Sequence, residues 1–241
     1  MFEPLVVEPA EMTEEVLSAT RRWCGYGCIR CGVTVYRYFS LPKEEGADAA
    51  GDGPSLGLLC PECLDLLGRR VAEAGPYRAL LARPIARDPD FDRRHLPYHV
   101  LLPEMRAGGP GPVRDTAAPV SVGGLVPLSF SPPLHGMGAT RLSVQLSDDE
   151  GPLRRIVDAN VWCPAEPGWR FAHRGARYVI EKDGGAARLE LDFPASNRVT
   201  VVHMRTRVGA RFVELTPDWL EVDGQRSVGA IRSGQLIGCT V

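Results

Sequence analysis

Two short stretches decide how the first part of this chain folds: Cys28-Ile29-Arg30-Cys31-Gly32 and Cys60-Pro61-Glu62-Cys63. Each stretch carries two cysteines separated by two residues, so together they offer four thiolates in the arrangement of a tetrahedral all-cysteine zinc site. The glycine after the first pair can adopt the positive φ that a tight metal-binding turn requires. We therefore expect one structural Zn²⁺ bound by Cys28, Cys31, Cys60 and Cys63. The same four donors also suit iron.

The sequence around the two pairs predicts a hairpin between two helices. Thr13, followed by acidic and apolar residues up to Trp23, is typical of a capped helix. A β-rich run at residues 33–39 leads away from the first pair, and residues 56–59 lead back to the second. Pro61 suits the first turn of a helix that we expect to end at Gly75-Pro76. A knuckle, a hairpin and a helix carrying the last two ligands make a treble-clef zinc finger, which is too small to fold without its metal.

The rest of the chain has a different character. Residues 103–124 are rich in Gly and Pro, and we expect them to link two domains. Beyond them, short β-type runs alternate with turn signals such as Asp183-Gly184-Gly185 and Asp223-Gly224. The expected strands are 141–146, 156–162, 178–181, 188–193, 199–204, 212–215 and 219–222. The sequence therefore predicts an α+β protein with a helical, treble-clef zinc-binding domain at residues 1–102. An all-β domain at residues 125–241 follows, built as a sandwich, a roll or stacked strands.

Composition narrows the possible partners. A formal net charge of -2 gives no global attraction to nucleic acid or to anionic lipid. No stretch approaches the ~20 apolar residues that span a bilayer, and residues 1–10 lack the basic start and apolar core of a secretory signal. Four of the seven cysteines have paired spacing, which favours metal binding in a reducing cytoplasm over a disulfide framework. We expect a cytoplasmic protein without a membrane partner.

The predicted finger resembles the zinc-supported finger of bacterial HNH endonucleases over roughly residues 20–75. Residues 21–32, Arg21-Arg22-Trp23-Cys24-Gly25-Tyr26-Gly27-Cys28-Ile29-Arg30-Cys31-Gly32, are similar to the entry of such proteins, and Leu58-Leu59-Cys60-Pro61-Glu62-Cys63 is similar to their second knuckle. The β domain resembles tails that follow such fingers in some bacterial proteins. The resemblance implies a scaffold that, in active members, holds a divalent cation beside a histidine that activates water for phosphodiester cleavage.

This sequence departs from the nuclease pattern at each catalytic position. Tyr38-Phe39 stands where the resemblance places an Asp-His or His-His pair, Ser55 replaces the asparagine, and Leu64 replaces the last histidine. Phenylalanine and leucine can neither ligate a cation nor accept a proton, so we expect no catalytic residue in a degenerate finger. His95 and His99 are one helical turn apart and are candidates for a relocated metal site, but Pro97 lies between them.

Three functions remain open at this point. The first is a zinc-binding, non-catalytic interaction or assembly protein whose β domain contacts a protein partner or another copy of the chain. The second is a nucleic-acid-binding protein, or an HNH-family nuclease with a relocated metal site, in a defence or mobile-element context. In that case phosphates would be contacted by Arg30, Arg37, Arg69 and Arg70. The third is an enzyme site in the β domain, with a pocket lined by Trp162, Trp169 and Trp219. The replaced catalytic residues favour the first.

Overall fold

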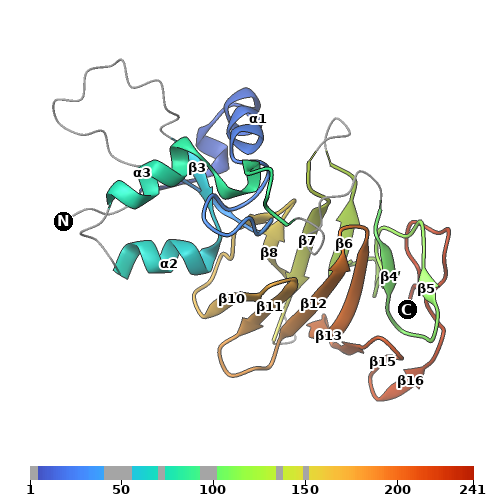
Figure 1. Cartoon of the computed structure of the whole chain (residues 1–241). Helices are drawn as coiled ribbons and strands as arrows, with labels where there is room; N and C mark the ends of the chain where they lie inside the picture. The colour runs from blue at the N-terminus through green and yellow to red at the C-terminus, as the bar shows by residue number, and fades with distance from the viewer. Residues whose placement is uncertain (1–4, 41–55, 70–73, 93–101, 134–137, 149–151) are drawn as a thin grey trace. The chain divides into compact units, whose positions relative to one another are not determined.

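The computed structural model describes residues 5–40, 56–69, 74–92, 102–133, 138–148 and 152–241 (Figure 1). The chain divides into an N-terminal unit, Met1–Asp92, and a C-terminal unit, Arg93–Val241, and each is described here by itself. Helices occur only in the N-terminal unit among these residues, and both units contain mostly antiparallel β-sheet. The expectation of a mixed protein that contains a β domain is therefore confirmed. Within the described ranges, no helix combines the length and the apolar character needed to cross a bilayer.

The N-terminal unit contains a three-stranded antiparallel sheet in the order β1-β2-β3. Its elements are β1 (Leu5–Val7), a 3₁₀ turn (Pro9–Glu11), α1 (Glu14–Trp23), β2 (Arg37–Ser40), β3 (Leu56–Leu59), α2 (Pro61–Arg69), α3 (Ala74–Ala82) and a second 3₁₀ turn (Ile85–Arg87).

The two predicted helices of this unit have different outcomes. The first is confirmed: the Thr13 hydroxyl accepts a hydrogen bond from the backbone N–H of Val16 at 3.5 Å and caps α1. The second is described as α2 up to Arg69, and residues 70–73 lie outside the described residues. Gly75-Pro76, where this helix was expected to end, lies at the start of the described part of α3 instead of stopping a helix. Proline is tolerated in the first turn because the N–H that it lacks has no partner there.

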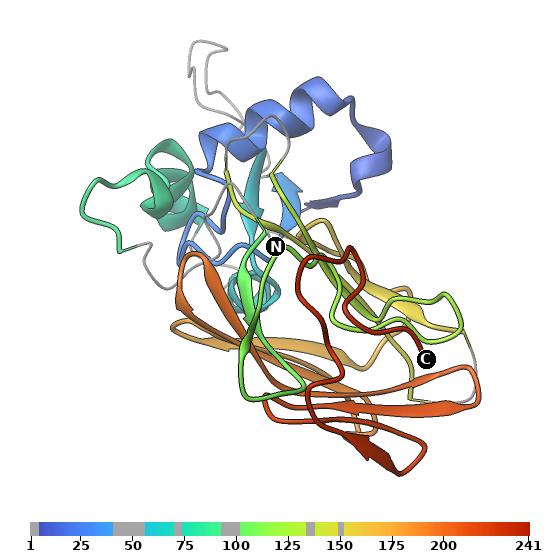
Figure 2. The same cartoon turned by 90° about the vertical axis from the view of Figure 1, so that its right-hand side faces the viewer.

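The C-terminal unit contains two sheets, whose strands can be followed in Figures 1 and 2. The smaller sheet has the order β6-β7-β8-β9, and the larger runs in chain order from β10 to β16. Strand β4 adds to the larger sheet by parallel pairing with β13, and β5 pairs with β4. The strands are β4 (Glu104–Arg106), β5 (Pro112–Val113), β6 (Leu128–Ser131), β7 (Arg141–Leu146), β8 (Arg154–Asp158), β9 (Val161–Trp162), β10 (Trp169–Arg174), β11 (Arg177–Lys182), β12 (Arg188–Ala195), β13 (Arg198–Val208), β14 (Arg211–Leu215), β15 (Leu220–Val222) and β16 (Gln225–Ser227).

Turn residues set the boundaries of these strands. Asp183-Gly184-Gly185 and Asp223-Gly224 form the hairpin turns that the sequence predicts, with positive φ at both glycines of the first and at both residues of the second. The strand expected at 156–162 is two strands, because Ala159 and Asn160 adopt positive φ values of 47° and 76° between β8 and β9. The segment 103–124, expected as a linker, carries β4 and β5 of the larger sheet.

Aromatic side chains form the centre of the β core. Trp162 of β9, Phe171 of β10, Tyr178 of β11 and Phe193 of β12 follow one another with ring-centroid separations of 6.0, 5.6 and 4.9 Å. Since Trp162 belongs to the smaller sheet and the other three to the larger, this row of rings joins the two sheets. All four side chains are buried.

The remaining tryptophans do not support a tryptophan-lined pocket. Trp169 is also buried, and the guanidinium of Arg226 covers the ring of Trp219 at 3.9 Å.

Candidate metal centre

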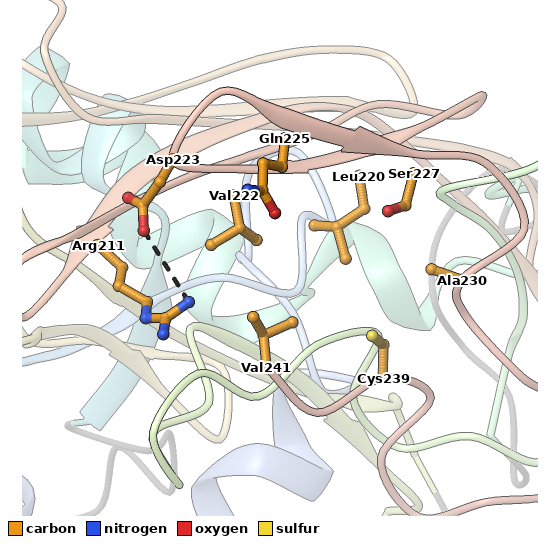
Figure 3. A pocket seen from close by; sticks show the side chains of 9 residues that line it. All are labelled: Arg211, Leu220, Val222, Asp223, Gln225, Ser227, Ala230, Cys239 and Val241. Carbon is orange, nitrogen blue, oxygen red and sulfur yellow. Dashed lines mark ion pairs between the residues drawn. The ribbon is translucent and has the colours of Figure 1, made fainter.

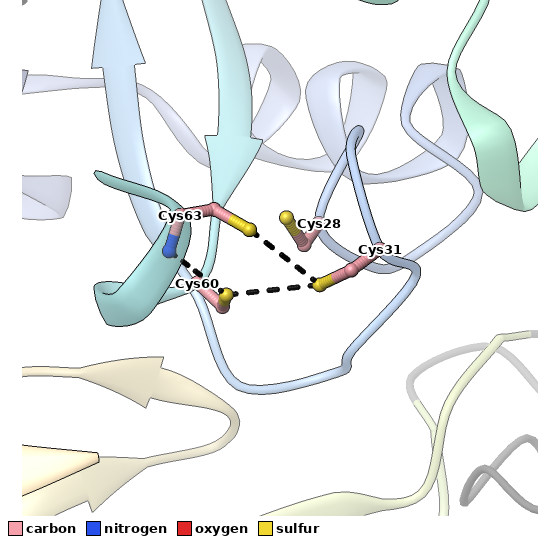
Figure 4. A group of neighbouring side chains, drawn as sticks. All are labelled: Cys28, Cys31, Cys60 and Cys63. Carbon is pink, nitrogen blue, oxygen red and sulfur yellow. Dashed lines mark hydrogen bonds between the residues drawn. The ribbon is translucent and has the colours of Figure 1, made fainter. Parts of the chain in front are cut away.

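The four predicted cysteine ligands come together in the N-terminal unit (Figure 4). Their sulfur atoms all lie within 4.8 Å of one another. The sulfur of Cys31 is 3.7 Å from that of Cys60 and 3.8 Å from that of Cys63. A tetrahedron with metal–sulfur bonds of about 2.3 Å has edges of about 3.8 Å, so the spacing is that of a four-coordinate metal site. The cluster is therefore able to hold a metal ion.

Backbone hydrogen bonds shape the turn that carries the first pair. The N–H of Cys28 donates to the carbonyl of Val33 at 2.8 Å, and the N–H of Gly32 donates to the carbonyl of Cys28 at 2.8 Å. Gly32 has a φ of 75°, and a Cβ added there would lie 2.1 Å from the ring of Phe91. Glycine is needed at this position for two reasons, since both the backbone conformation and the ring of Phe91 exclude a side chain.

The second pair is positioned by the start of α2. The carbonyl of Cys60 accepts the N–H of Leu64 at 2.9 Å, so Cys60 and Cys63 lie within one helical turn. The N–H of Ile29 donates to the carbonyl of Leu58 at 2.9 Å. This bond fastens the first turn to the end of β3 and brings the two cysteine pairs into contact.

N–H groups donate to sulfur atoms of the cluster. The backbone N–H of Cys63 donates to the Cys60 sulfur at 3.4 Å, and the guanidinium of Arg30 donates to the Cys63 sulfur at 3.7 Å. Such bonds stabilise negative charge on sulfur and support bound metal from outside its ligands. Arg30, predicted as a phosphate contact, is thus committed to the cluster. In the sequence, only the position of Arg30 between the two cysteines of the first pair indicates that it contacts the cluster.

The ionisation of the cysteines also suits a cation. Burial opposes the charged form of Cys28, but hydrogen bonds from the other three thiols and from the Cys60 N–H hold the pKa of Cys28 well below its usual value. The pKa values of Cys31 and Cys60 are raised, chiefly because each shares a hydrogen bond with the charged Cys28 sulfur. Without metal the cluster keeps protons between its sulfurs, and a divalent cation would displace them. Burial raises the pKa of Cys24 to about 12, so that thiol stays protonated.

The positions where the HNH resemblance implies catalytic residues carry packed side chains. Phe39 is fully buried, and Tyr38 is buried with its hydroxyl accepting a hydrogen bond from Arg21 at 2.9 Å. Burial raises the pKa of Tyr38, so the phenol stays neutral near pH 7 and cannot act as a general base. Leu64 lies in α2 next to the cluster ligand Cys63. Ser55 lies outside the described residues.

The structure describes the side chain of only one of the three remaining arginines that were predicted to contact phosphate. Arg37 forms an ion pair with Glu8 at 2.7 Å. Arg69 is the last residue of α2, and Arg70 lies outside the described residues, as do His95 and His99. Whether the four arginines form one surface therefore stays a prediction.

A second candidate site is a cavity of about 350 Å³ in the C-terminal unit (Figure 3). Leu220 and Val222 of β15 face Val241 across it, and Arg211 and Asp223 form an ion pair at one end at 3.9 Å. Burial raises the pKa of Cys239, which makes the thiol in this cavity a weak nucleophile. The cavity has a mixed lining, in which apolar side chains lie beside the polar side chains of Arg211, Asp223, Gln225 and Ser227. Sequence reasoning missed it because its residues come from separated segments, 211, 220–230 and 239–241.

Comparisons with known proteins add nothing to this geometry: no protein-family model, curated protein or solved structure matches the chain.

Proposed function

We propose that this chain is a zinc-binding, non-catalytic interaction protein built on a degenerate, HNH-like treble-clef finger. The observation that carries the proposal is the closed cysteine cluster, in which Cys28, Cys31, Cys60 and Cys63 supply four sulfurs within 4.8 Å. Structural zinc sites have four protein ligands, whereas catalytic sites keep one position for water or substrate. Four cysteines around one ion leave no such position. Zn²⁺ fits this role because it has no redox chemistry that would disturb a structural site.

The surroundings of the cluster support a structural role over a nuclease role. In a nuclease of this type, a base must reach the attacking water and a cation must face the developing charge on phosphorus. Tyr38 is neutral and bonded to Arg21, and Phe39 has no polar group. Nucleic-acid binding is the weaker alternative, because Arg30 and Arg37 are engaged by Cys63 and Glu8.

The interaction is assigned to the C-terminal unit, as contact with a protein partner or with a second copy of the chain. Among the described residues of this unit, the most exposed large apolar side chains are Val228 at 69% and Leu236 at 75% of their maximal accessible surface. The proposal is that they contribute to an apolar contact with the partner, because apolar surface gains free energy when a partner removes it from water.

Assays of metal content, of DNA cleavage and binding, and of protein contact on the purified full chain test the proposal. We expect one Zn²⁺ per chain by elemental analysis, and neither cleavage nor gel shift of single- or double-stranded DNA with Mg²⁺, Mn²⁺ or Ni²⁺.

We also expect light scattering to detect oligomers, or a pull-down to retain a partner. Leu236→Ser should weaken the contact, and Arg22→Ser, on the other unit, should leave it unchanged. DNA cleavage that His95→Ala or His99→Ala abolishes would overturn the non-catalytic assignment. A chain that purifies without metal would overturn the zinc assignment.

A further inference from the structure

The four sulfurs of the cysteine cluster are not equally protected. Cys28 and Cys60 are fully buried and Cys63 is 3% exposed, whereas Cys31 is partly exposed. A thiolate reacts with an electrophile or an oxidant only where the reagent can reach the sulfur. Judged by accessibility alone, Cys31 is the ligand that a reagent reaches first.

Hydrogen bonds lower the reactivity of the second cysteine pair. The N–H of Cys63 donates to the sulfur of Cys60, and the guanidinium of Arg30 donates to the sulfur of Cys63. A donor withdraws electron density from the sulfur that accepts it, so these bonds reduce the nucleophilicity of Cys60 and Cys63.

We infer that Cys31 is a modification site: the cysteine of this cluster that soft electrophiles and peroxides attack first, with a cysteine of the second pair as its disulfide partner. The inference rests on the proposed zinc-binding function. The Cys31 thiolate attacks one oxygen of hydrogen peroxide, which gives a sulfenic acid and releases hydroxide. A second thiolate attacks the sulfenic sulfur, forms the S–S bond and releases a second hydroxide. Two thiolates lose two electrons, and the peroxide is reduced to two water molecules after protonation.

Both sulfurs of the second pair are close enough to be the partner of Cys31. The sulfurs of Cys60 and Cys63 lie 3.7 and 3.8 Å away, which is the separation at which a thiolate can attack a sulfenic acid with little movement. A disulfide removes two of the four ligands, so oxidation releases the metal. The proposed consequence is that peroxide destabilises the fold of the N-terminal unit, because the metal holds together the turn and the helix that carry the ligands.

The first test uses the full chain loaded with one Zn²⁺ and treated with a limiting amount of N-ethylmaleimide or hydrogen peroxide. Peptide mass spectrometry locates the modification, and a zinc-chelating dye follows metal release. We expect Cys31 to be alkylated about tenfold faster than any other ligand, and peroxide to give a Cys31–Cys60 or Cys31–Cys63 disulfide together with zinc release. Earlier modification of Cys28, Cys60 or Cys63 would overturn the inference while leaving the zinc assignment intact. A chain without zinc would instead overturn the proposed function.

Two pairs of variants sharpen the test. Cys31→His keeps a metal ligand but removes the nucleophile, and we expect slower peroxide-driven zinc release, whereas the matched Cys28→His should release zinc at least as fast as the natural chain. If either variant fails to fold, the modification map of the natural chain still decides. Arg30→Met removes the donor to Cys63 and should make Cys63 the second cysteine to be alkylated. Arg22→Met, an exposed arginine of α1, should leave the order unchanged.

Discussion

The N-terminal unit gathers four cysteine sulfurs within 4.8 Å at the end of a three-stranded sheet, whereas the C-terminal unit gathers Trp162, Phe171, Tyr178 and Phe193 into a row of rings that joins two sheets. If the proposed zinc is bound, the first arrangement depends on an ion that the chain must acquire, whereas the second depends on apolar burial. The comparison teaches that one chain can hold its parts by different physical means. Each part should then fail under a different perturbation.

Metal loss should produce the largest difference between the units. Cys60→Ser, or removal of the ion with a chelator, should unfold the N-terminal unit, because bound zinc contributes about 10–16 kcal/mol of apparent folding free energy in small fingers. The C-terminal unit should keep its β-sheet circular dichroism and its thermal transition. Cys163→Ser is the matched control, since this partly exposed cysteine lies in the other unit. Metal content of one per chain in Cys60→Ser would contradict the four-cysteine site.

Damage to the aromatic core should give the reverse pattern. Phe193 is 1% exposed, and its ring centroid lies 4.9 Å from that of Tyr178. Truncation to alanine should lower the free energy of unfolding of the C-terminal unit by about 3–5 kcal/mol, because it leaves a cavity in a packed core. The zinc content should not change. Denaturant unfolding monitored by tryptophan fluorescence gives the loss, and a simultaneous loss of metal would show that the two units depend on each other.

The first metal-binding turn offers a smaller and more local test. Gly32→Ala places a Cβ at a φ of 75° and against the Phe91 ring, and the backbone strain alone costs about 1–2 kcal/mol. The same change at Gly184, which has a φ of 88° and an open neighbourhood, measures strain without the clash. We expect Gly32→Ala to weaken zinc affinity and Gly184→Ala to leave it unchanged. Adding Phe91→Ala should recover the part of the loss that comes from the ring.

Alkaline pH should also weaken the N-terminal unit. Burial raises the pKa of Tyr36 well above its usual value of about 10. Because the folded state binds this proton more tightly than the unfolded state, the stabilisation is complete below about pH 10 and is lost as pH rises further. The slope approaches 1.4 kcal/mol per pH unit for one group, or about a tenfold change in the folding constant. Tyr36→Phe should flatten the slope in denaturant titrations between about pH 9 and 11. An unchanged slope would show that the loss of stability at high pH comes from groups other than Tyr36.

The sequence predicted the parts of both units that depend on local chemistry. The structure confirms three short patterns: the cysteine pairs, the Thr13 cap and the Asp-Gly turns. Each of them depends on residues that are close together in the sequence. The contact of Phe91 with Gly32 could not be predicted, because it joins residues 59 positions apart and no periodicity marks it.

The same reason explains the other differences. Residues 103–124 look like a linker because Gly and Pro disfavour regular structure, yet β4 finds a partner in β13, far along the chain. Arg30 was interpreted as a phosphate contact, since its charge is visible in the sequence but its acceptor is not. Long-range pairing decides these cases, and a single sequence carries little information about it.

Charged side chains on the solvent face of the larger sheet should matter least. Arg170, Glu181 and Arg188 are successive cross-strand neighbours on β10, β11 and β12, and Glu181 lies 3.4 Å from Arg170 and 2.8 Å from Arg188. Exposed pairs of this kind contribute about 0.2–1 kcal/mol each, because water and salt screen them. Glu181→Gln should therefore lower the free energy of unfolding by less than about 1 kcal/mol, and high salt should abolish even that difference. Val213→Ala, in the same sheet but buried, should have the larger effect at every salt concentration. A larger loss for Glu181→Gln would mean that surface charge, and not the aromatic row, sets the stability of the C-terminal unit.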